Sequence, residues 1–143
     1  MSHGHCALCT TDGGVVVFRH DKWRVVWAQE AGFPGFYRVI WNAHVSEWSD
    51  LAPADQLSCM SAVTVVERVL REELVPDKIN LATLGNVVPH LHWHVIARYQ
   101  WDSHFPAPVW ATAVRGPDEQ RLAQLLDKRT VVENALRRRL AAL

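Results

Sequence analysis

The sequence predicts an α+β protein with a mainly antiparallel sheet of about five strands and two helices. Two observations lead to this fold class. Short apolar segments separated by turn residues predict strands joined as hairpins, without the regular alternation of strand and helix that a parallel sheet requires. Two longer segments instead carry apolar residues at helical spacing. With 143 residues, the chain has the size of a single domain, 1–143.

The first three strands are expected near the N-terminus. A turn that contains two glycines precedes an apolar strand at residues 15–18. A short polar turn then leads into a second strand at 23–27, so these two strands form a hairpin. A segment with two glycines and a proline interrupts the pattern, and a third strand follows at 36–41.

The remaining elements begin with a long amphipathic helix at 53–74. Pro53 suits the first position of a helix, where its missing N–H costs nothing, and Pro76 follows the expected end. Two further strands are expected at 79–84 and 91–97. After two more prolines, leucines and a valine at helical spacing predict a C-terminal helix at about 117–142.

Composition excludes several classes of function. Lys plus Arg total 15 and Asp plus Glu total 15, so no general basic field exists to hold a long nucleic acid, although a small nucleotide remains an option. No apolar run is long enough to span a bilayer, and the N-terminus lacks the pattern of a secretory signal. The odd number of cysteines suits thiols or a metal in a reducing compartment, so we expect a cytoplasmic protein.

Three histidines alternate with apolar residues in the segment 89–96. On a strand, His90, His92 and His94 project to one face, and the apolar residues between them project to the other. The pattern alone allows three interpretations. It fits a half-buried strand whose exposed face carries histidine, a metal site, or nucleophilic catalysis, because a neutral imidazole attacks phosphorus well.

The run His90-Leu91-His92-Trp93-His94-Val95-Ile96 resembles the signature of the histidine triad (HIT) family, and a bacterial branch of it most closely. The resemblance covers about 6–110, which is the core of the HIT-like fold that it implies. Its other landmarks are Asn80, Gly85, Arg98, the segment 39–45, Asp50 with Leu51, and the tail 101–106.

The resemblance implies an enzyme, a nucleotide hydrolase or transferase. His92 is then the nucleophile, and a main-chain carbonyl holds its other nitrogen. The enzyme cleaves nucleoside phosphoramidates or dinucleoside polyphosphates at the α-phosphorus, through a nucleotidyl-histidine intermediate. His94 contacts the scissile phosphate and assists the leaving group, and His90 completes the catalytic set. No catalytic metal is required, and members of this family usually form homodimers with their two sheets side by side.

The resemblance also implies a nucleotide site, with three departures from the family. Its residues are Asn80, Gly85, Asn86, His92 and His94. Asn86 stands where the family often has glutamine, Val87 where a serine commonly helps to hold phosphate, and Ala97 where proline or glycine is frequent. These departures concern phosphate binding and leave the nucleophile intact. They leave a non-catalytic nucleotide-binding protein of the same fold as an alternative, and a zinc-dependent hydrolase with a histidine-bound water is a further one.

Cys6 and Cys9 have the spacing that lets two thiolates reach one tetrahedral ion. The pair alone also fits two reduced cysteines near a chain end, or a redox pair. Zinc-containing relatives of the family, including the galactose-1-phosphate uridylyltransferase branch, imply a structural zinc site. Its ligands would be Cys6, Cys9, His44 and His90, with His3 and His5 as alternatives. A closed set of four ligands would orient the triad and leave no position for a reactive water.

Overall fold

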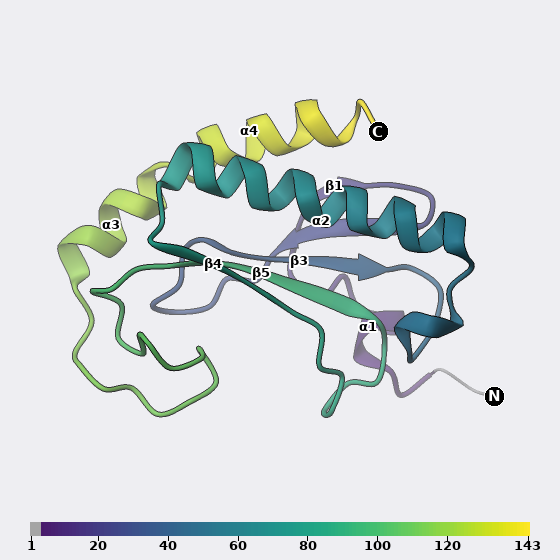
Figure 1. Ribbon diagram of the computed structural model, residues 1–143, viewed down its shortest axis with the longest axis horizontal. Helices are drawn as coiled ribbons and strands as arrows, with labels where there is room; N and C mark the ends of the chain where they lie inside the picture. Colours follow the sequence, from purple (N-terminus) through teal and green to yellow (C-terminus); the bar gives the residue numbers. More distant parts are fainter. Residues whose placement is uncertain (1–3) are drawn as a thin grey trace.

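The computed structural model describes residues 4–143 and contains one five-stranded sheet in the order β1-β2-β3-β5-β4. Every neighbouring pair of strands is antiparallel, so the expected fold class is confirmed (Figure 1). The strands are β1 Val15–Arg19, β2 Trp23–Trp27, β3 Phe36–Trp41, β4 Lys78–Ala82 and β5 His92–Arg98. The helices are α1 Ala7–Thr10, the 3-10 turn η1 Trp48–Asp50, α2 Pro53–Leu74, α3 Glu119–Asp127 and α4 Arg129–Leu140.

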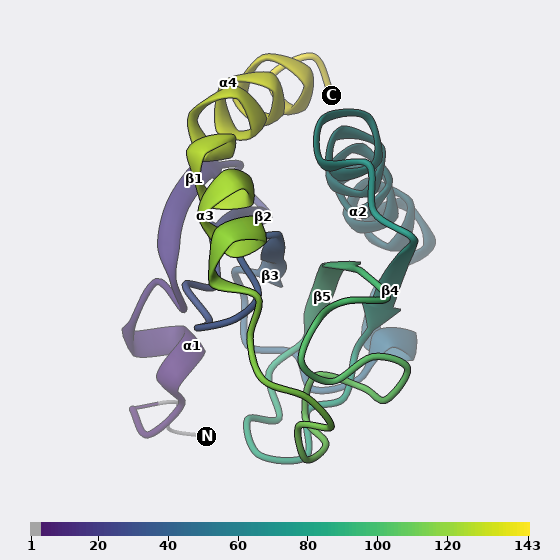
Figure 2. The ribbon, with the colours of Figure 1, turned by 90° about the vertical axis from the view of Figure 1, so that its left-hand side faces the viewer.

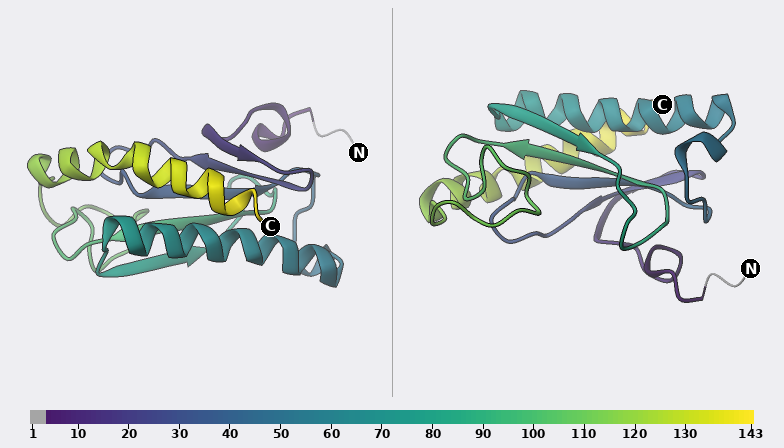
Figure 3. Two further views of the ribbon diagram at one scale, coloured as in Figure 1. Left: turned by 90° about the horizontal axis from the view of Figure 1, so that it is seen from above. Right: turned by 60° about the horizontal axis from the view of Figure 1, so that its bottom comes forward.

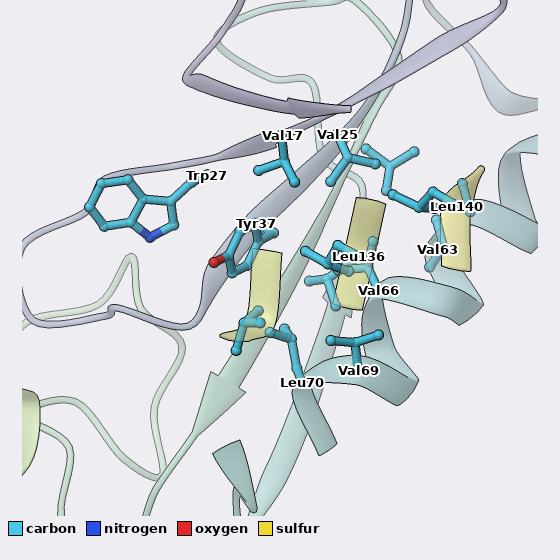
Figure 4. Close-up of a cluster of buried hydrophobic side chains, with 14 of the residues drawn as sticks. Val17, Val25, Trp27, Tyr37, Val63, Val66, Val69, Leu70, Leu136 and Leu140 are labelled. Atoms are coloured by element: carbon cyan, nitrogen blue, oxygen red, sulfur yellow. The ribbon is translucent and has the colours of Figure 1, made fainter. Parts of the chain in front are cut away.

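The two faces of the sheet have different roles. Helices α2 and α4 lie side by side over one face, as Figures 2 and 3 show from two directions. Alternate strand residues such as Val25, Tyr37 and Val95 point to that face and are buried there. They pack against Val66 of α2 and Leu136 of α4, and Figure 4 shows this apolar core. The core therefore lies between the sheet and its helices, which leaves the opposite face for the site.

Helix α2 follows the sequence prediction at both ends. It begins at Pro53, which occupies the first turn, and it ends at Leu74. Val75 then adopts a left-handed conformation, with φ 46° and ψ 57°, which stops the helix before Pro76. Residues at helical spacing along α2 are buried toward the sheet, because the apolar stripe of the helix faces the core.

The C-terminal part of the chain differs from the single helix expected at 117–142. Helix α3 ends at Asp127 and α4 begins at Arg129, with Lys128 between them. Helix α3 buries none of its residues, whereas α4 buries Val132 and Leu136 against the core. Helical spacing continues through both segments, so the sequence shows no break, and the separate packing of α4 sets its direction.

The strand boundaries also differ slightly from the expectation. Strand β4 covers Lys78–Ala82 instead of 79–84, and β5 begins at His92 instead of residue 91. The short elements α1 and η1 were not expected from the sequence. None of the helices within residues 4–143 has the length and apolar character needed to cross a membrane.

Candidate active site and metal cluster

Two of the three alternating histidines lie on strand β5. His92 pairs with Ile40 and His94 pairs with Arg38 of β3, so both side chains project from the face opposite α2 and α4. His90 precedes the strand, which corrects the expectation that all three residues alternate along it. Its N–H donates to the Val88 carbonyl at 2.8 Å in a tight turn, and this turn separates His90 from the regular ladder.

His92 has its two ring nitrogens in different environments. Nδ1 lies 2.5 Å from the carbonyl oxygen of His90, and a carbonyl only accepts hydrogen bonds. Nδ1 therefore carries the hydrogen and donates it, so Nε2 keeps its lone pair in the neutral ring. Burial lowers the pKa of His92, which favours this neutral form, and the nearby positive charge of Arg38 acts in the same direction.

His94 lies in an aromatic surrounding beside His92. The ring centroids of the two histidines are 4.9 Å apart, and the rings of Phe36 and Trp110 contact His94 edge-on at 5.5 and 5.0 Å. Burial is the largest cause that lowers the pKa of His94 to about 3, followed by repulsion from His92 and Arg38. His94 is therefore neutral at pH 7. Its buried Nδ1 has no hydrogen-bond partner among residues 4–143.

The four residues expected to hold zinc lie together. The ligand atoms of Cys6, Cys9, His44 and His90 all fall within 4.8 Å of one another. Nδ1 of His90 is 3.4 Å from Sγ of Cys6 and 3.5 Å from Sγ of Cys9. Nδ1 of His44 is 3.3 Å from Sγ of Cys9. A tetrahedral zinc ion separates such ligand atoms by about 3.5 Å, so the cluster fits a metal ion of this kind.

The second nitrogen of His90 supports the same conclusion. Nε2 lies 2.6 Å from the carbonyl oxygen of Trp41, so it donates its hydrogen there and leaves Nδ1 free of hydrogen. Metal-bound histidines usually donate their other N–H to such an acceptor. Burial lowers the pKa of His90, which favours the neutral form that binds metals. The His90 ring thus points into the cysteine cluster, and the ring of His92 remains separate from it.

Arg24 fixes the cysteine-bearing segment to the sheet. Its guanidinium donates to the carbonyl oxygens of Leu8 at 2.8 Å and Asp12 at 2.9 Å, and to the side chain of Asn42 at 3.0 Å. Leu8 packs against Val26 and Ile40 below it. Because α1 has only four residues, these contacts hold it in place.

The nucleotide-binding residues expected from the resemblance, apart from the histidines, lie on strand β4 and in the loop between β4 and β5. Asn80 on β4 accepts a hydrogen bond from Arg98 at 2.8 Å. Gly85, whose φ is +77°, forms a turn in the loop between β4 and β5. Asn86 and Val87 are exposed in this loop, and within the described chain no hydrogen bond connects Asn86 to His92 or His94.

Sequence reasoning missed two residues at this site. Trp110 covers His94 although it follows the last strand by more than ten positions, and no local pattern predicts that contact. Arg38 lies opposite His94, and here a signal was present, because it is a charged residue in an otherwise apolar strand. Of the alternative metal ligands, His5 is outside the cluster and exposed, and His3 lies outside the described residues.

The fold and the site define a small α+β protein with a buried histidine pair beside a candidate metal cluster. The sequence matches the family described as HIT domain over residues 12–101. Because this match covers more than half of the chain, the chain belongs to the histidine triad family. None of the curated proteins gives a significant match.

Solved structures of the same family are similar over most of the chain. A histidine triad protein from Bradyrhizobium japonicum has 29% sequence identity and a TM-score of 0.69, covering 90% of this chain and 92% of its own. A second, from Marinobacter aquaeolei VT8, has 25% identity and a TM-score of 0.69, covering 87% and 92%. A Zn-bound histidine triad family protein from Mycobacterium smegmatis has 22% identity and a TM-score of 0.61, covering 99% and 96%.

Proposed function

We propose that the chain is a nucleotide hydrolase or transferase in which His92 attacks the α-phosphorus of a nucleoside phosphoramidate or a dinucleoside polyphosphate. The observation that carries this proposal is the hydrogen bond from His92 Nδ1 to the His90 carbonyl. It leaves the Nε2 lone pair on the face of the sheet that α2 and α4 do not cover. An imidazole in this state is a nucleophile for phosphorus and later a leaving group.

The reaction has two displacement steps. First, Nε2 of His92 forms a bond to phosphorus while the bond from phosphorus to the leaving nitrogen or oxygen breaks, and the leaving atom keeps that electron pair and takes a proton from solvent. Water then attacks the nucleotidyl-histidine, which releases a nucleoside monophosphate and restores the electron pair of Nε2. His94, neutral at pH 7, assists through hydrogen bonds to phosphoryl oxygen or to the leaving atom.

The proposed role of the metal cluster is structural. Cys6, Cys9, His44 and His90 would hold zinc in a closed set of four, as their spacing and the Zn-bound relative from Mycobacterium smegmatis support. Bound zinc would fix the end of β5 and with it the carbonyl that His92 uses. Cysteines kept as thiols or as metal ligands suit a reducing compartment, so we place the protein in the cytoplasm.

The proposed enzyme is a homodimer joined through the outer edge of β4. Strand β4 pairs only with β5 within the described chain, and Leu81 is 43% exposed. At the opposite edge of the sheet, the carbonyl of Val17 on β1 already accepts a hydrogen bond from Arg137 of α4. An unpaired strand edge with an exposed leucine is a surface on which a second sheet can continue.

The test is release of AMP from adenosine 5′-phosphoramidate, measured with and without a chelator. We expect the natural chain to release AMP, His92→Ala to lose this activity, and the control His20→Ala to keep it. Quench of a single turnover in alkaline denaturant should trap AMP on the natural chain and not on His92→Ala, because the bond from phosphorus to a histidine nitrogen survives alkali and is cleaved in acid. Activity that survives His92→Ala would overturn the mechanism. Nucleotide binding without any turnover would identify a non-catalytic binder, and complete loss in chelator would favour a zinc-dependent hydrolase.

A further inference from the structure

Arg38 is a cation in the centre of the sheet, beside the proposed reaction site. It lies between Phe36 and Ile40 on strand β3 and directly opposite His94 on β5, so its side chain starts on the same face as His92 and His94. The ring of Phe36 links the two groups, because it lies under the Arg38 guanidinium and contacts the ring of His94 edge-on at 5.5 Å. None of the steps proposed for His92 uses this charge.

The guanidinium has few partners for a group in this position. Its side chain is 21% exposed, and Nη1 donates to the Gly13 carbonyl at 2.9 Å. Nη2 is 3.9 Å from a carboxylate oxygen of Glu30, which is longer than a hydrogen bond, and the Glu30 side chain is 53% exposed. The ring of Phe36 lies 5.3 Å away. Because a guanidinium has five N–H donors, Arg38 retains donors for an anion, and Glu30 can move aside into solvent.

The direction of the Arg38 side chain places its charge to one side of the phosphorus that His92 attacks. Gly13 accepts the hydrogen bond of Arg38 within the turn before β1. The neighbouring Gly14 packs on β2, where an added Cβ would lie 2.5 Å from the Trp27 carbonyl oxygen. Strand β2 is on the opposite side of β3 from β5. The guanidinium therefore leans toward β1 and β2, whereas His92 lies on β5, so its remaining donors lie to one side of the phosphate that His92 attacks.

We propose that Arg38 binds a second phosphate group of the nucleotide, apart from the phosphate at His92. This inference rests on the proposed function, because a nucleotide supplies anions as phosphates, and a guanidinium binds phosphate oxygens through two parallel hydrogen bonds. The second phosphate comes from either of two sources, the 5′ phosphate chain or a phosphate on the ribose 3′ oxygen. Both present the same chemistry to Arg38.

The experiment is equilibrium binding of three ligands that undergo no hydrolysis at an anhydride. They are AMP, the methylene analogue of ADP, and adenosine 3′,5′-bisphosphate. Each is titrated into the natural chain, Arg38→Gln, Arg38→Lys and the control Arg19→Gln. Arg19 is an exposed arginine paired with Asp12, so its variant makes the same change of net charge.

We expect one of the doubly phosphorylated ligands to bind the natural chain and Arg19→Gln at least about tenfold more tightly than AMP does. The ligand that shows this advantage identifies the source of the second phosphate. The advantage should fall to about twofold or less in Arg38→Gln and be partly kept in Arg38→Lys, whose charge lacks the planar fork. If Arg38→Gln does not fold, Arg38→Lys tests the proposal in its place. A doubly phosphorylated ligand that keeps its full advantage over AMP in Arg38→Lys overturns the proposal.

Two other kinds of result separate a failure of the role of Arg38 from a failure of the proposed function. AMP binding with no advantage for either doubly phosphorylated ligand overturns the role of Arg38 and leaves the proposed function in place. If a doubly phosphorylated ligand keeps its advantage over AMP in Arg38→Gln, the role of Arg38 is likewise overturned and the proposed function stays in place. Absence of binding of all three ligands to the natural chain overturns the proposed function and the role of Arg38 together.

Discussion

The carbonyl oxygen of His90 accepts a hydrogen bond from Nδ1 of His92 at 2.5 Å. The side chain of the same His90 points its Nδ1 at the thiols of Cys6 and Cys9. One residue therefore belongs to the metal cluster through its ring and to the proposed nucleophile through its backbone. A change at the cluster can reach the nucleophile through this single connection, without contact between the metal ligands and the ring of His92.

Loss of a metal ligand should slow the reaction without abolishing it. In Cys9→Ser, we expect loss of one equivalent of zinc and a fall in kcat of about 10- to 100-fold, which is the range for groups that act on a reaction only by orienting another residue. The reason is that an unanchored His90 holds the tautomer of His92 less firmly. Metal content and AMP release measure the two effects. Cys59→Ala, in the buried core, is the control that should keep its zinc. An unchanged kcat after loss of zinc would contradict this coupling.

His94 should make the folded protein sensitive to mild acid. Its pKa is about 3 in the folded chain and about 6.5 when unfolded, so between these values the unfolded state binds more protons. The stability contributed by neutral His94 is complete above pH 6.5 and is lost as the pH falls toward 3. In His94→Asn, the decline of the unfolding free energy with acid should be shallower, by at most about 1.4 kcal/mol per pH unit.

Urea unfolding at several pH values from 7 to 4, with chelator in every sample, measures this slope. The control is His20→Asn, because His20 is partly exposed and stacks on Trp23. An identical slope in the natural chain and His94→Asn would show that His94 does not cause the acid sensitivity.

Asp102 should contribute strongly to the stability of the folded protein, because it anchors the segment that follows strand β5. It is buried with Arg98, whose guanidinium donates to it at 2.8 and 3.1 Å, and it accepts the backbone N–H groups of His104 and Phe105 at 3.0 and 2.7 Å. Asp102→Ala leaves the buried charge of Arg98 without its carboxylate partner, and we expect a loss of about 3–5 kcal/mol in unfolding free energy. Urea unfolding tests this, with the exposed Asp21→Ala as control. A loss below about 1 kcal/mol would contradict the argument.

The free edge of β4 should determine the oligomeric state. We expect the natural chain, of 16.2 kDa, to have the mass of a dimer in light scattering after size exclusion. Leu81→Lys should be monomeric, because a lysine on the strand edge opposes pairing with a second sheet. Leu57→Lys is the matched control, since Leu57 is exposed on α2 and distant in sequence from this edge. A monomeric natural chain would refute the interface.

The sequence predicted those helices and strands whose ends and apolar spacing are set by residues within the element itself. Helix α2 was predicted from Pro53 to Leu74, because its proline and its apolar spacing are both contained in the segment itself. The division between α3 and α4 at Lys128 was not predicted, because the break follows from how α4 packs on the core. His90 was expected on a strand by its alternation with His92, and the turn from Val88 to His90 removes it from that strand.

The sequence by itself determined the chemical inventory of this protein: a family signature around His92, a cysteine pair, and strands that form an antiparallel sheet. Only the tertiary structure decided which groups meet. It turns the ring of His90 toward Cys6 and Cys9, brings Trp110 against His94, and leaves Arg38 with few partners on the same face of the sheet as the histidine pair. The reason is physical: spacing along a chain fixes the face on which a side chain starts, whereas hydrogen bonds and packing with distant segments fix where its atoms end.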